Sequence, residues 1–446
     1  MQTLATLSAA LAAGKTSSRQ LVEECLARIA DPTGEGARAF IKVDAAGARA
    51  SADAMDMLRK AGRAPGPLAG IPFAVKDLAN IAGQPTPSGS AVLAGAPPAA
   101  ENAPVVQRAM DAGLVVMGRT NMTEFAFSGL GINPHYGTPR SPWDRATGRI
   151  PGGSSSGTAV AVADGMAYVG LGTDTGGSCR IPAAMCGIVG YKPTARRVPI
   201  TGILPLSTSL DSVGPLANSV ACCAAVDAVF AGLPLPDLKP LPLAGLRLAV
   251  PTNMMLEGLD EIVAATFDRA LAALSAAGAT IVRVAFPALS AIQPANAAGG
   301  IAAPEAWAWH RALIAEKADG YDPRVLVRIR GGARMEAADY IDVINARAAL
   351  IAQFNAETYG YDALIMPTCP LIPPTISSLD DEAEYGRVNM MQLRNPAAGN
   401  FLDRCAISLP CHRLGDAPVG LMLMGETMGD ARLFAVAAAV EATIPR

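Results

Sequence analysis

Glycine and serine are concentrated in two clusters, at 151–157 (PGGSSSG) and at 170–178 (GLGTDTGGS). Glycine lets backbone N–H groups approach a ligand closely, and successive N–H groups form a nest that binds anions. Such a nest could hold a phosphate or the oxyanion that forms during acyl transfer. The two clusters therefore indicate either phosphate binding or chemistry at a serine hydroxyl.

Phosphate binding is the weaker of these two interpretations. A phosphate loop reads GxxxxGK[ST], and a dinucleotide-binding loop reads GxGxxG at the start of a helix. The glycines at 170, 172 and 176 fit neither spacing, and no lysine follows them at the required position. Serine chemistry remains.

One serine pattern has Ser155 at its centre. The stretch from Gly153 to Gly157 matches the GxSxG nucleophile elbow, which requires an acid and then a histidine later in the chain. His310 and His412 are the only later histidines, and Asp362 could precede His412. GxSxG arises easily in a loop rich in glycine and serine, so this match has little weight.

A second serine pattern uses lysine as the base. Lys76 lies in the apolar segment 70–83 (GIPFAVKDLANIAG). Burial disfavours the charged form of lysine, so a buried amine can be neutral near pH 7 and accept a proton. The alternative is that Lys76 pairs with Asp77 or reaches solvent. From this residue alone, the alternative is the better interpretation.

Several segments together resemble the amidase signature family, in the order in which that family has them. The resemblance covers nearly the whole chain and keeps the family's spacing between Ser154 and Ser178. The matching segments are 67–77 (PLAGIPFAVKD), 118–129 (GRTNMTEFAFSG), 151–157 (PGGSSSG), 170–194 (GLGTDTGGSCRIPAAMCGIVGYKPT) and 417–425 (APVGLMLMG).

The resemblance implies roles for three residues. Ser178 is expected to be the nucleophile and Lys76 the base. Ser154, expected to follow a cis peptide bond after Gly153, would pass the proton between them. This implication reverses the interpretation of Lys76 given by the residue alone.

The resemblance also implies an oxyanion hole and supporting contacts. The expected donors are the backbone N–H groups of Thr175, Gly176, Gly177 and Ser178. Donors of this kind commonly contribute about 3–4 kcal/mol to transition-state stabilisation. Ser155 is expected to hydrogen-bond within its loop, and Asp174 to cap or brace the nest.

Residues around these positions receive secondary predictions. Ser128, Gly129 and Leu130 are expected to lie at the substrate pocket, since they follow a stretch that lies near the substrate mouth in relatives. Arg180 is expected to form a structural ion pair rather than to bind a substrate carboxylate. Cys179 stands where the family usually has an aliphatic residue, and a small buried side chain is the expected role.

Alternating helices and strands must position these residues. Apolar residues recur at helical spacing in 19–30, 45–61, 102–112, 259–277, 336–357 and 430–443. Short apolar runs typical of strands occupy 114–118, 246–250, 280–286, 363–367 and 419–425. This alternation predicts an α/β fold with a mixed, mainly parallel central sheet flanked by helices.

The domain prediction is one amidase signature domain over residues 1–446. It comprises an N-terminal helical segment (about 1–62), a catalytic core (about 63–220) and a remainder that completes the sheet and the substrate pocket. The Pro-rich segment 232–245 is predicted to be a surface crossover within this domain, since the α/β pattern continues on both sides of it.

Composition limits the possible partners. Apolar residues make up 51% of the chain, the net charge is −3, and the basic residues are scattered, so neither nucleic acid nor an anionic membrane is expected to bind. The N-terminus lacks the basic start of a secretory signal. The eight cysteines form no CxxC pair, and reduced, mostly buried thiols in a cytoplasmic protein are the expectation.

The expected function is hydrolysis of a small or aryl carboxamide to an acid and ammonia or an amine, without metal or organic cofactor. One alternative is the amidase subunit of a glutamine-dependent tRNA amidotransferase, although its glutamine-binding pattern is not recognised. Another is a catalytically silent binding member, which the presence of Lys76, Ser154 and Ser178 disfavours. The expected partner is a small-molecule amide, and a homodimer is the default expectation for oligomeric state.

Overall fold

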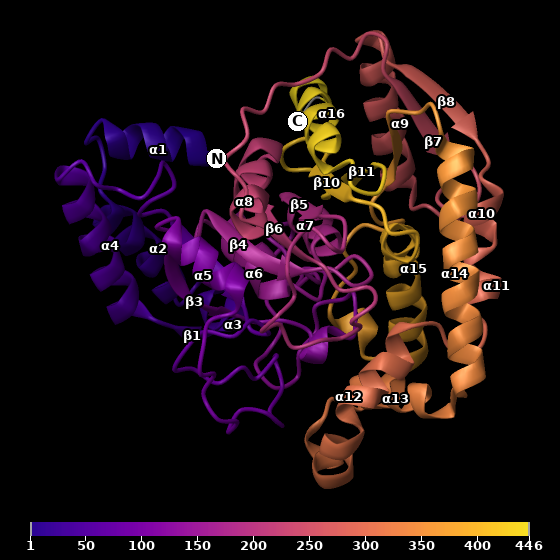
Figure 1. Ribbon diagram of the computed structural model, residues 1–446, viewed down its shortest axis with the longest axis horizontal. Coiled ribbons are helices and arrows are strands. Elements are labelled where there is room, and N and C mark those ends of the chain that lie inside the picture. The colour runs from indigo at the N-terminus through magenta and orange to yellow at the C-terminus, as the bar shows by residue number, and fades with distance from the viewer. Residues whose placement is uncertain (1, 445–446) are drawn as a thin grey trace.

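Eleven strands form one sheet at the centre of the computed structural model, which describes residues 2–444 (Figure 1). Every residue of β2, β4, β5, β6, β9, β10 and β11 is buried, as in a sheet covered on both faces. The order across the sheet is β1-β3-β2-β4-β6-β5-β10-β11-β9-β7-β8. The strands are β1 (Phe40–Val43), β2 (Pro72–Lys76), β3 (Val115–Thr120), β4 (Val169–Thr173), β5 (Val189–Lys192), β6 (Val213–Ala217), β7 (Arg247–Pro251), β8 (Thr280–Val284), β9 (Ala363–Pro367), β10 (Ala406–Pro410) and β11 (Gly420–Met424).

The sheet is mixed, and its parallel pairs occur in two places. β2 is parallel to β3 and β4, and β7 is parallel to β8 and β9. Helix α5 (Pro104–Asp111) joins β2 to β3, and α9 (Glu261–Ala276) joins β7 to β8, which gives the crossover that a parallel pair requires.

The other six pairings between described strands are antiparallel. The α/β class and the mixed sheet are confirmed, but antiparallel pairs outnumber the parallel ones, contrary to the expected parallel majority. The reason is connectivity. β10 and β11 form a hairpin, and β5 is joined to β6 by a segment without a crossover helix.

Helices cover the sheet and extend beyond its ends. α1, α2 and α4 lie together at the β1 end, whereas α9 and α14 lie at the opposite end beside β7 and β8 (Figure 1). Besides α5 and α9, the helices are α1 (Leu4–Ala12), α2 (Ser18–Ala30), α3 (Gly36–Ala39), α4 (Ala45–Lys60), α6 (Ser156–Ala163), α7 (Arg180–Cys186), α8 (Val220–Ala231), α10 (Pro287–Ser290), α11 (Ile292–Ala295), α12 (Ala302–Lys317), α13 (Pro323–Gly331), α14 (Ala337–Thr358), α15 (Glu382–Phe401) and α16 (Asp430–Thr443).

All six predicted helices form, because their apolar spacing coincides with start signals. The Ser17 side chain accepts a hydrogen bond from the N–H of Gln20 at the start of α2, and the Asp260 side chain accepts one from Ile262 at the start of α9. Side chains of these types satisfy N–H groups that have no partner within the first helical turn. The five predicted strands are also present, as β3, β7, β8, β9 and β11.

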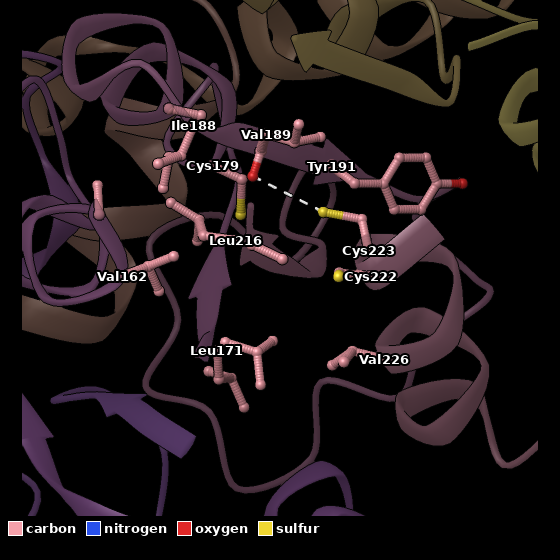
Figure 2. Close-up of a cluster of buried hydrophobic side chains, with 14 of the residues drawn as sticks. Val162, Leu171, Cys179, Ile188, Val189, Tyr191, Leu216, Cys222, Cys223 and Val226 are labelled. Carbon is pink, nitrogen blue, oxygen red and sulfur yellow. Dashed lines mark hydrogen bonds between the residues drawn. The ribbon is translucent and has the colours of Figure 1, made fainter. Parts of the chain in front are cut away.

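The core beneath the central strands is apolar and contains several cysteines. Figure 2 shows Cys179 and Cys223 in a cluster with Leu216 and Val189, where the Cys223 thiol lies 3.7 Å from the Val189 carbonyl oxygen. All eight cysteines are buried and none forms a disulfide, as predicted. The expected role of Cys179 as a small buried side chain is confirmed.

The Pro-rich segment 232–245 joins α8 to β7 without helix or strand and is largely exposed. In Figure 1 it runs along the top of the molecule. Strands on both sides of it belong to the same sheet, so it is a crossover within one domain. Among residues 2–444, no helix combines the length and the apolar character that crossing a membrane requires.

Candidate active site

Two neighbouring parallel strands bring Lys76 close to Thr173. Lys76 is the last residue of β2, and Thr173 is the last residue of its neighbour β4. Lys76 Nζ donates to Ser154 Oγ at 2.7 Å and to Thr173 Oγ1 at 2.8 Å. Thr173 is a contact that sequence reasoning missed. The sequence feature that marks Thr173 is the TDTGG run at the end of an apolar segment. This run indicates a contact with Lys76 only once β4 is known to pair with β2.

The Lys76 side chain is fully buried. Burial lowers its pKa to about 7, since removal from water disfavours the ammonium form. Asp77 does not pair with it. The Asp77 carboxylate accepts instead from Arg119 Nε at 2.7 Å. The alternative interpretation of Lys76, as an ion pair with its neighbour, is therefore wrong.

The first Gly/Ser cluster forms a tightly packed loop before α6. The peptide bond between Gly153 and Ser154 is cis, as the resemblance implied. The Gly153 N–H donates to the Gly129 carbonyl at 2.8 Å, and the Ser154 carbonyl accepts from the Thr123 N–H at 3.1 Å. A Cβ atom at position 153 would lie 2.6 Å from the Gly131 nitrogen, so only glycine fits there.

Ser155 lies one residue further, at the start of α6. Its hydroxyl donates to the Thr173 carbonyl at 3.4 Å, and no described histidine bonds to it. His310 Nδ1 lies 3.0 Å from the Tyr321 hydroxyl, and His412 Nδ1 accepts from the Val419 N–H at 3.2 Å. The GxSxG elbow centred on Ser155 is therefore not formed. The predicted hydrogen bond within the loop is replaced by one to the end of β4.

Ser178 lies in the second Gly/Ser cluster, just before α7. Ser178 is 3% exposed. Its carbonyl accepts from the Ser155 N–H at 3.3 Å, so the two clusters are hydrogen-bonded to each other. Within residues 2–444, the Ser178 hydroxyl makes no hydrogen bond to Ser154. Hydrogen bonds between reacting groups are often long or poorly aligned until a substrate binds. The structure thus places Ser178 beside the loop whose Ser154 is hydrogen-bonded to Lys76.

Asp174 braces the loop on both sides of Ser178. Its carboxylate accepts from the N–H groups of Gly177 at 2.8 Å and Cys179 at 3.1 Å. Arg180 donates to it through Nε at 3.0 Å and Nη2 at 2.8 Å, and both side chains are fully buried. Burial alone would raise the pKa of Asp174, but the charge and hydrogen bonds of Arg180 outweigh it and lower the pKa to about 2. Arg180 forms the predicted structural ion pair.

The hydrogen bond from Gly177 changes the predicted oxyanion hole. A donor already bonded to a carboxylate is not available to an oxyanion, so the inclusion of Gly177 is contradicted by this contact. The N–H groups of Thr175, Gly176 and Ser178 have no acceptor among the described residues. The Thr175 hydroxyl donates to Asp211 at 2.5 Å, and this hydrogen bond holds Thr175 in place.

Asp211 was not predicted and holds the outer side of the same loop. Its second carboxylate oxygen accepts from the N–H groups of Leu206 and Ser207. Burial raises the pKa of Asp211 to about 6. Nothing in the sequence around Asp211 distinguishes it from other acidic residues, since its role depends on a loop that folds back to β4.

The predicted pocket residues meet α15. Asn389 Oδ1 accepts from the Ser128 hydroxyl and from the Gly129 N–H, both at 2.9 Å. The Tyr385 hydroxyl donates to Ser128 at 2.9 Å, so Ser128 is held from two turns of one helix. Leu130 is fully buried in a separate apolar cluster with residues such as Ile132 and Ile150. Its side chain contributes to this cluster, and its role at the pocket stays a prediction.

α15 itself covers the loop that contains Ser178, and the sequence did not predict this helix. A Cβ atom at Gly176 would lie 3.5 Å from Leu393 and 3.9 Å from Ala397, and one at Gly177 would lie 2.6 Å from Pro396. Gly176, Leu393 and Ala397 are partly exposed, whereas Pro396 is buried. Gly176 is therefore the point at which the loop that contains Ser178 is partly exposed.

Comparisons with known proteins show the family of this chain. An amidase family model matches residues 20–434. The chain is 38% identical to a 2-amino-5-chloromuconic acid deaminase of Comamonas testosteroni over 90% of this chain and 87% of that protein. It is 36% identical to a glutamyl-tRNA(Gln) amidotransferase subunit of Chloroflexus aggregans, over 97% of this chain and 94% of that protein.

Solved structures give the same result. A crystal structure of an amidase superposes with a TM-score of 0.90 and 32% identity, covering 99% of this chain and 100% of that one. The matched region includes both Gly/Ser clusters, Lys76 and the helix that covers them. This chain therefore belongs to the amidase family of amide-hydrolysing enzymes.

Proposed function

We propose that this enzyme hydrolyses a small or aryl carboxamide through an acyl-enzyme on Ser178, with Ser154 as proton relay and Lys76 as base. The observation that carries the proposal is the environment of Lys76. Its Nζ lies 2.7 Å from Ser154 Oγ in a fully buried position where the pKa falls to about 7. A base with a pKa near the working pH is best suited to accept and return a proton.

The first half of the reaction forms the acyl-enzyme. The Ser178 oxygen attacks the amide carbon while its proton passes to Ser154, and the proton of Ser154 passes to the neutral Lys76 amine. The oxyanion accepts hydrogen bonds from the N–H groups of Thr175, Gly176 and Ser178. The Lys76 ammonium then returns its proton through Ser154 to the leaving nitrogen, and the C–N bond breaks.

The second half releases the acid. A water molecule gives its proton to the same relay and attacks the acyl carbon. Collapse of the second oxyanion breaks the bond to Ser178, which takes back a proton from Ser154. The products are a carboxylic acid and ammonia or an amine, and both ends of the relay return to their starting state.

The size of the substrate is supported by the site and by one relative. Ser178 is almost completely buried and approached past Gly176, which favours a small acyl group. The Comamonas testosteroni relative is named as a deaminase of a small acid, 2-amino-5-chloromuconic acid. A panel of indole-acetamide, malonamide, aryl acylamides and ureido compounds will identify the class that this chain hydrolyses.

Labelling with a fluorophosphonate tests the proposed nucleophile directly. The wild-type protein is expected to gain one adduct by intact mass, located on the peptide that contains Ser178, and to lose its amidase activity. Ser178→Ala is expected to gain none and to have no turnover. Equal labelling or full activity of Ser178→Ala would contradict the assignment. An unlabelled and inactive wild-type protein would favour the catalytically silent alternative.

A second candidate function is the amidase subunit of a tRNA-dependent amidotransferase. The observation in its favour is the 36% identity to the Chloroflexus aggregans amidotransferase subunit, which extends over 97% of this chain. In that role Ser178 would attack the side-chain amide of glutamine and form a glutamyl-enzyme. The ammonia released would pass to a partner enzyme. Copurification with a second subunit, together with activity that depends on glutamine, would favour this candidate over the free-standing amidase.

A further inference from the structure

Gln392 on α15 is an exception among the buried amides of its helix. Its side chain is fully buried, yet neither Oε1 nor Nε2 has a hydrogen-bond partner among the described residues. Asn389, Asn395 and Asn400 on the same helix all make hydrogen bonds through their amides. Buried amide groups normally have partners, because losing water without a replacement is unfavourable. Both ends of the Gln392 amide are therefore free to hydrogen-bond to a molecule from outside the chain.

The position of Gln392 relates it to the nucleophile. In a helix, residues three and four apart share a face, so Gln392 lies on the stripe that runs from Asn389 to Pro396. Asn389 accepts from the Gly129 N–H at one end of this stripe. At the other end, Pro396 Cβ would lie 2.6 Å from a Cβ atom at Gly177.

The same stripe meets solvent at one point. Leu393, next to Gln392, would lie 3.5 Å from a Cβ atom at Gly176, and both residues are partly exposed. Leu393 also packs against the apolar cluster that contains Ile181 and Cys369. A ligand that enters past Gly176 thus meets an apolar surface, with the unbonded amide of Gln392 as the buried polar group nearest to it along the helix.

We propose that Gln392 selects substrates that carry a second carboxamide or ureido group in the part of the molecule that remains on the enzyme. This inference rests on the proposed function, since it assigns the specificity of the Ser178 site. A primary amide offers a donor and an acceptor side by side, and a second amide pairs with both in a reciprocal arrangement. A carboxylate would bond only to Nε2 and leave Oε1 unbonded, and an apolar group would leave both unbonded.

Matched substrates separate this recognition from general reactivity. Malonamide, succinamide and glutaramide are each paired with the monoamide in which an isopropyl group of similar size replaces the distal carboxamide. The wild-type enzyme is expected to prefer at least one diamide over its partner by about 100-fold in kcat/KM, because a site built around hydrogen bonds strongly rejects a ligand that lacks them.

Gln392→Leu should remove this preference. The kcat/KM for the preferred diamide is expected to fall about tenfold or more, while that for the isopropyl partner is unchanged or rises. The melting temperature should not fall, because the variant removes two unbonded polar atoms from the interior. Met390→Leu, at an exposed position on the same helix, is the matched control and should leave both values unchanged. Equal losses on both substrates of a pair, or a preference that survives Gln392→Leu, would overturn the proposal.

Binding measurements distinguish its failure from a failure of the proposed function. Calorimetry compares binding of the same diamides to Ser178→Ala and to Ser178→Ala/Gln392→Leu. Binding that depends on Gln392 without turnover in the wild type would support recognition and contradict the Ser178 mechanism. Turnover with a preference that is independent of Gln392 would support the Ser178 mechanism and contradict recognition by Gln392. The absence of both turnover and binding would contradict both.

Discussion

At the residue scale, Lys76 combines a full burial with two hydroxyl partners, Ser154 and Thr173. No carboxylate of the described residues lies within ion-pair distance of it. Because burial lowers its pKa to about 7, the amine is mostly protonated below this pH, and in the proposed mechanism it then cannot act as the base. We expect kcat/KM to rise through about pH 7 and to level off above it. A profile of kcat/KM between pH 5.5 and about 9.5 measures this limb.

Thr173→Val tests the cause of this limb. The variant keeps the shape of the side chain but removes an acceptor that favours the ammonium form, so the pKa of Lys76 should fall further. We expect the limb to move to lower pH. A limb that stays in place in Thr173→Val would show that another group controls it.

Lys76→Ala should reduce kcat/KM by about a thousandfold or more at every pH.

The two adjacent serines should differ strongly. Ser154 Oγ lies 2.7 Å from Lys76 Nζ, whereas the Ser155 hydroxyl makes one long hydrogen bond to the Thr173 carbonyl. We expect Ser154→Ala to reduce kcat by about 100-fold or more and Ser155→Ala by less than about tenfold. Steady-state kinetics on one substrate is sufficient. The reverse order would favour Ser155 as the nucleophile.

At the scale of elements, α15 and the nucleophile loop are joined through buried charges. Asn400 on α15 donates to Asp174 Oδ1 at 2.9 Å and accepts from Arg180 Nη2 at 2.7 Å. The end of the covering helix is therefore fixed to the residue that braces both sides of Ser178. A change at Arg180 should reach the active site without touching the substrate.

Arg180→Met should lower the free energy of unfolding by removing the ion pair with Asp174. It leaves the Asp174 carboxylate buried without its counter-charge, which costs about 3–5 kcal/mol in the free energy of unfolding. The pKa of Asp174, lowered to about 2, lies below its ordinary value of 3.8. The stability that this shift gives the wild type is thus present above pH 3.8 and lost as the pH falls towards 2. Urea denaturation of both proteins at pH 7 measures the difference, and a change below about 1 kcal/mol would contradict the assigned role.

At the scale of the whole molecule, the folded protein should protect every thiol from reagents in solution. All eight cysteines are buried, and burial raises the pKa of Cys179, next to Ser178, well above its usual range. A thiol reagent such as dithiobis(nitrobenzoate) is expected to react with none of them within minutes in the native state and with eight in denaturant. The native enzyme should keep its activity under these conditions. Rapid native modification with loss of activity would contradict this arrangement.

Periodicity and family resemblance predicted the elements that have their own local signal. The helix from 337 to 358 and the strand at 363–367 are recognisable because each buries one regular pattern of apolar residues. The cis bond at Gly153–Ser154 and the meeting of Lys76 with Ser154 followed from the resemblance.

What the sequence did not predict depends on long-range contacts. α15 carries Pro396 and several buried amides, so its apolar periodicity is weak and no local signal marked it. The apolar cluster of Leu130 with Ile132, Ile150 and residues of α15 also forms between distant parts of the chain. Asp211 and Asn400 lie far from Asp174 and Thr175 in the chain, and only the folded loops bring them together.

The strand order has a consequence for how the chain is made. β10 and β11 follow the other nine strands of this sheet in the chain, yet they lie between β5 and β9 in the finished sheet. Until they emerge, synthesis delivers two part-sheets with open edges, β1 to β6 on one side and β7 to β9 on the other. Pairing over such a long stretch of chain is slow, and open edges attract strands of other molecules. The nascent chain is thus most prone to aggregation in the interval before the hairpin of β10 and β11 joins the two parts of the sheet.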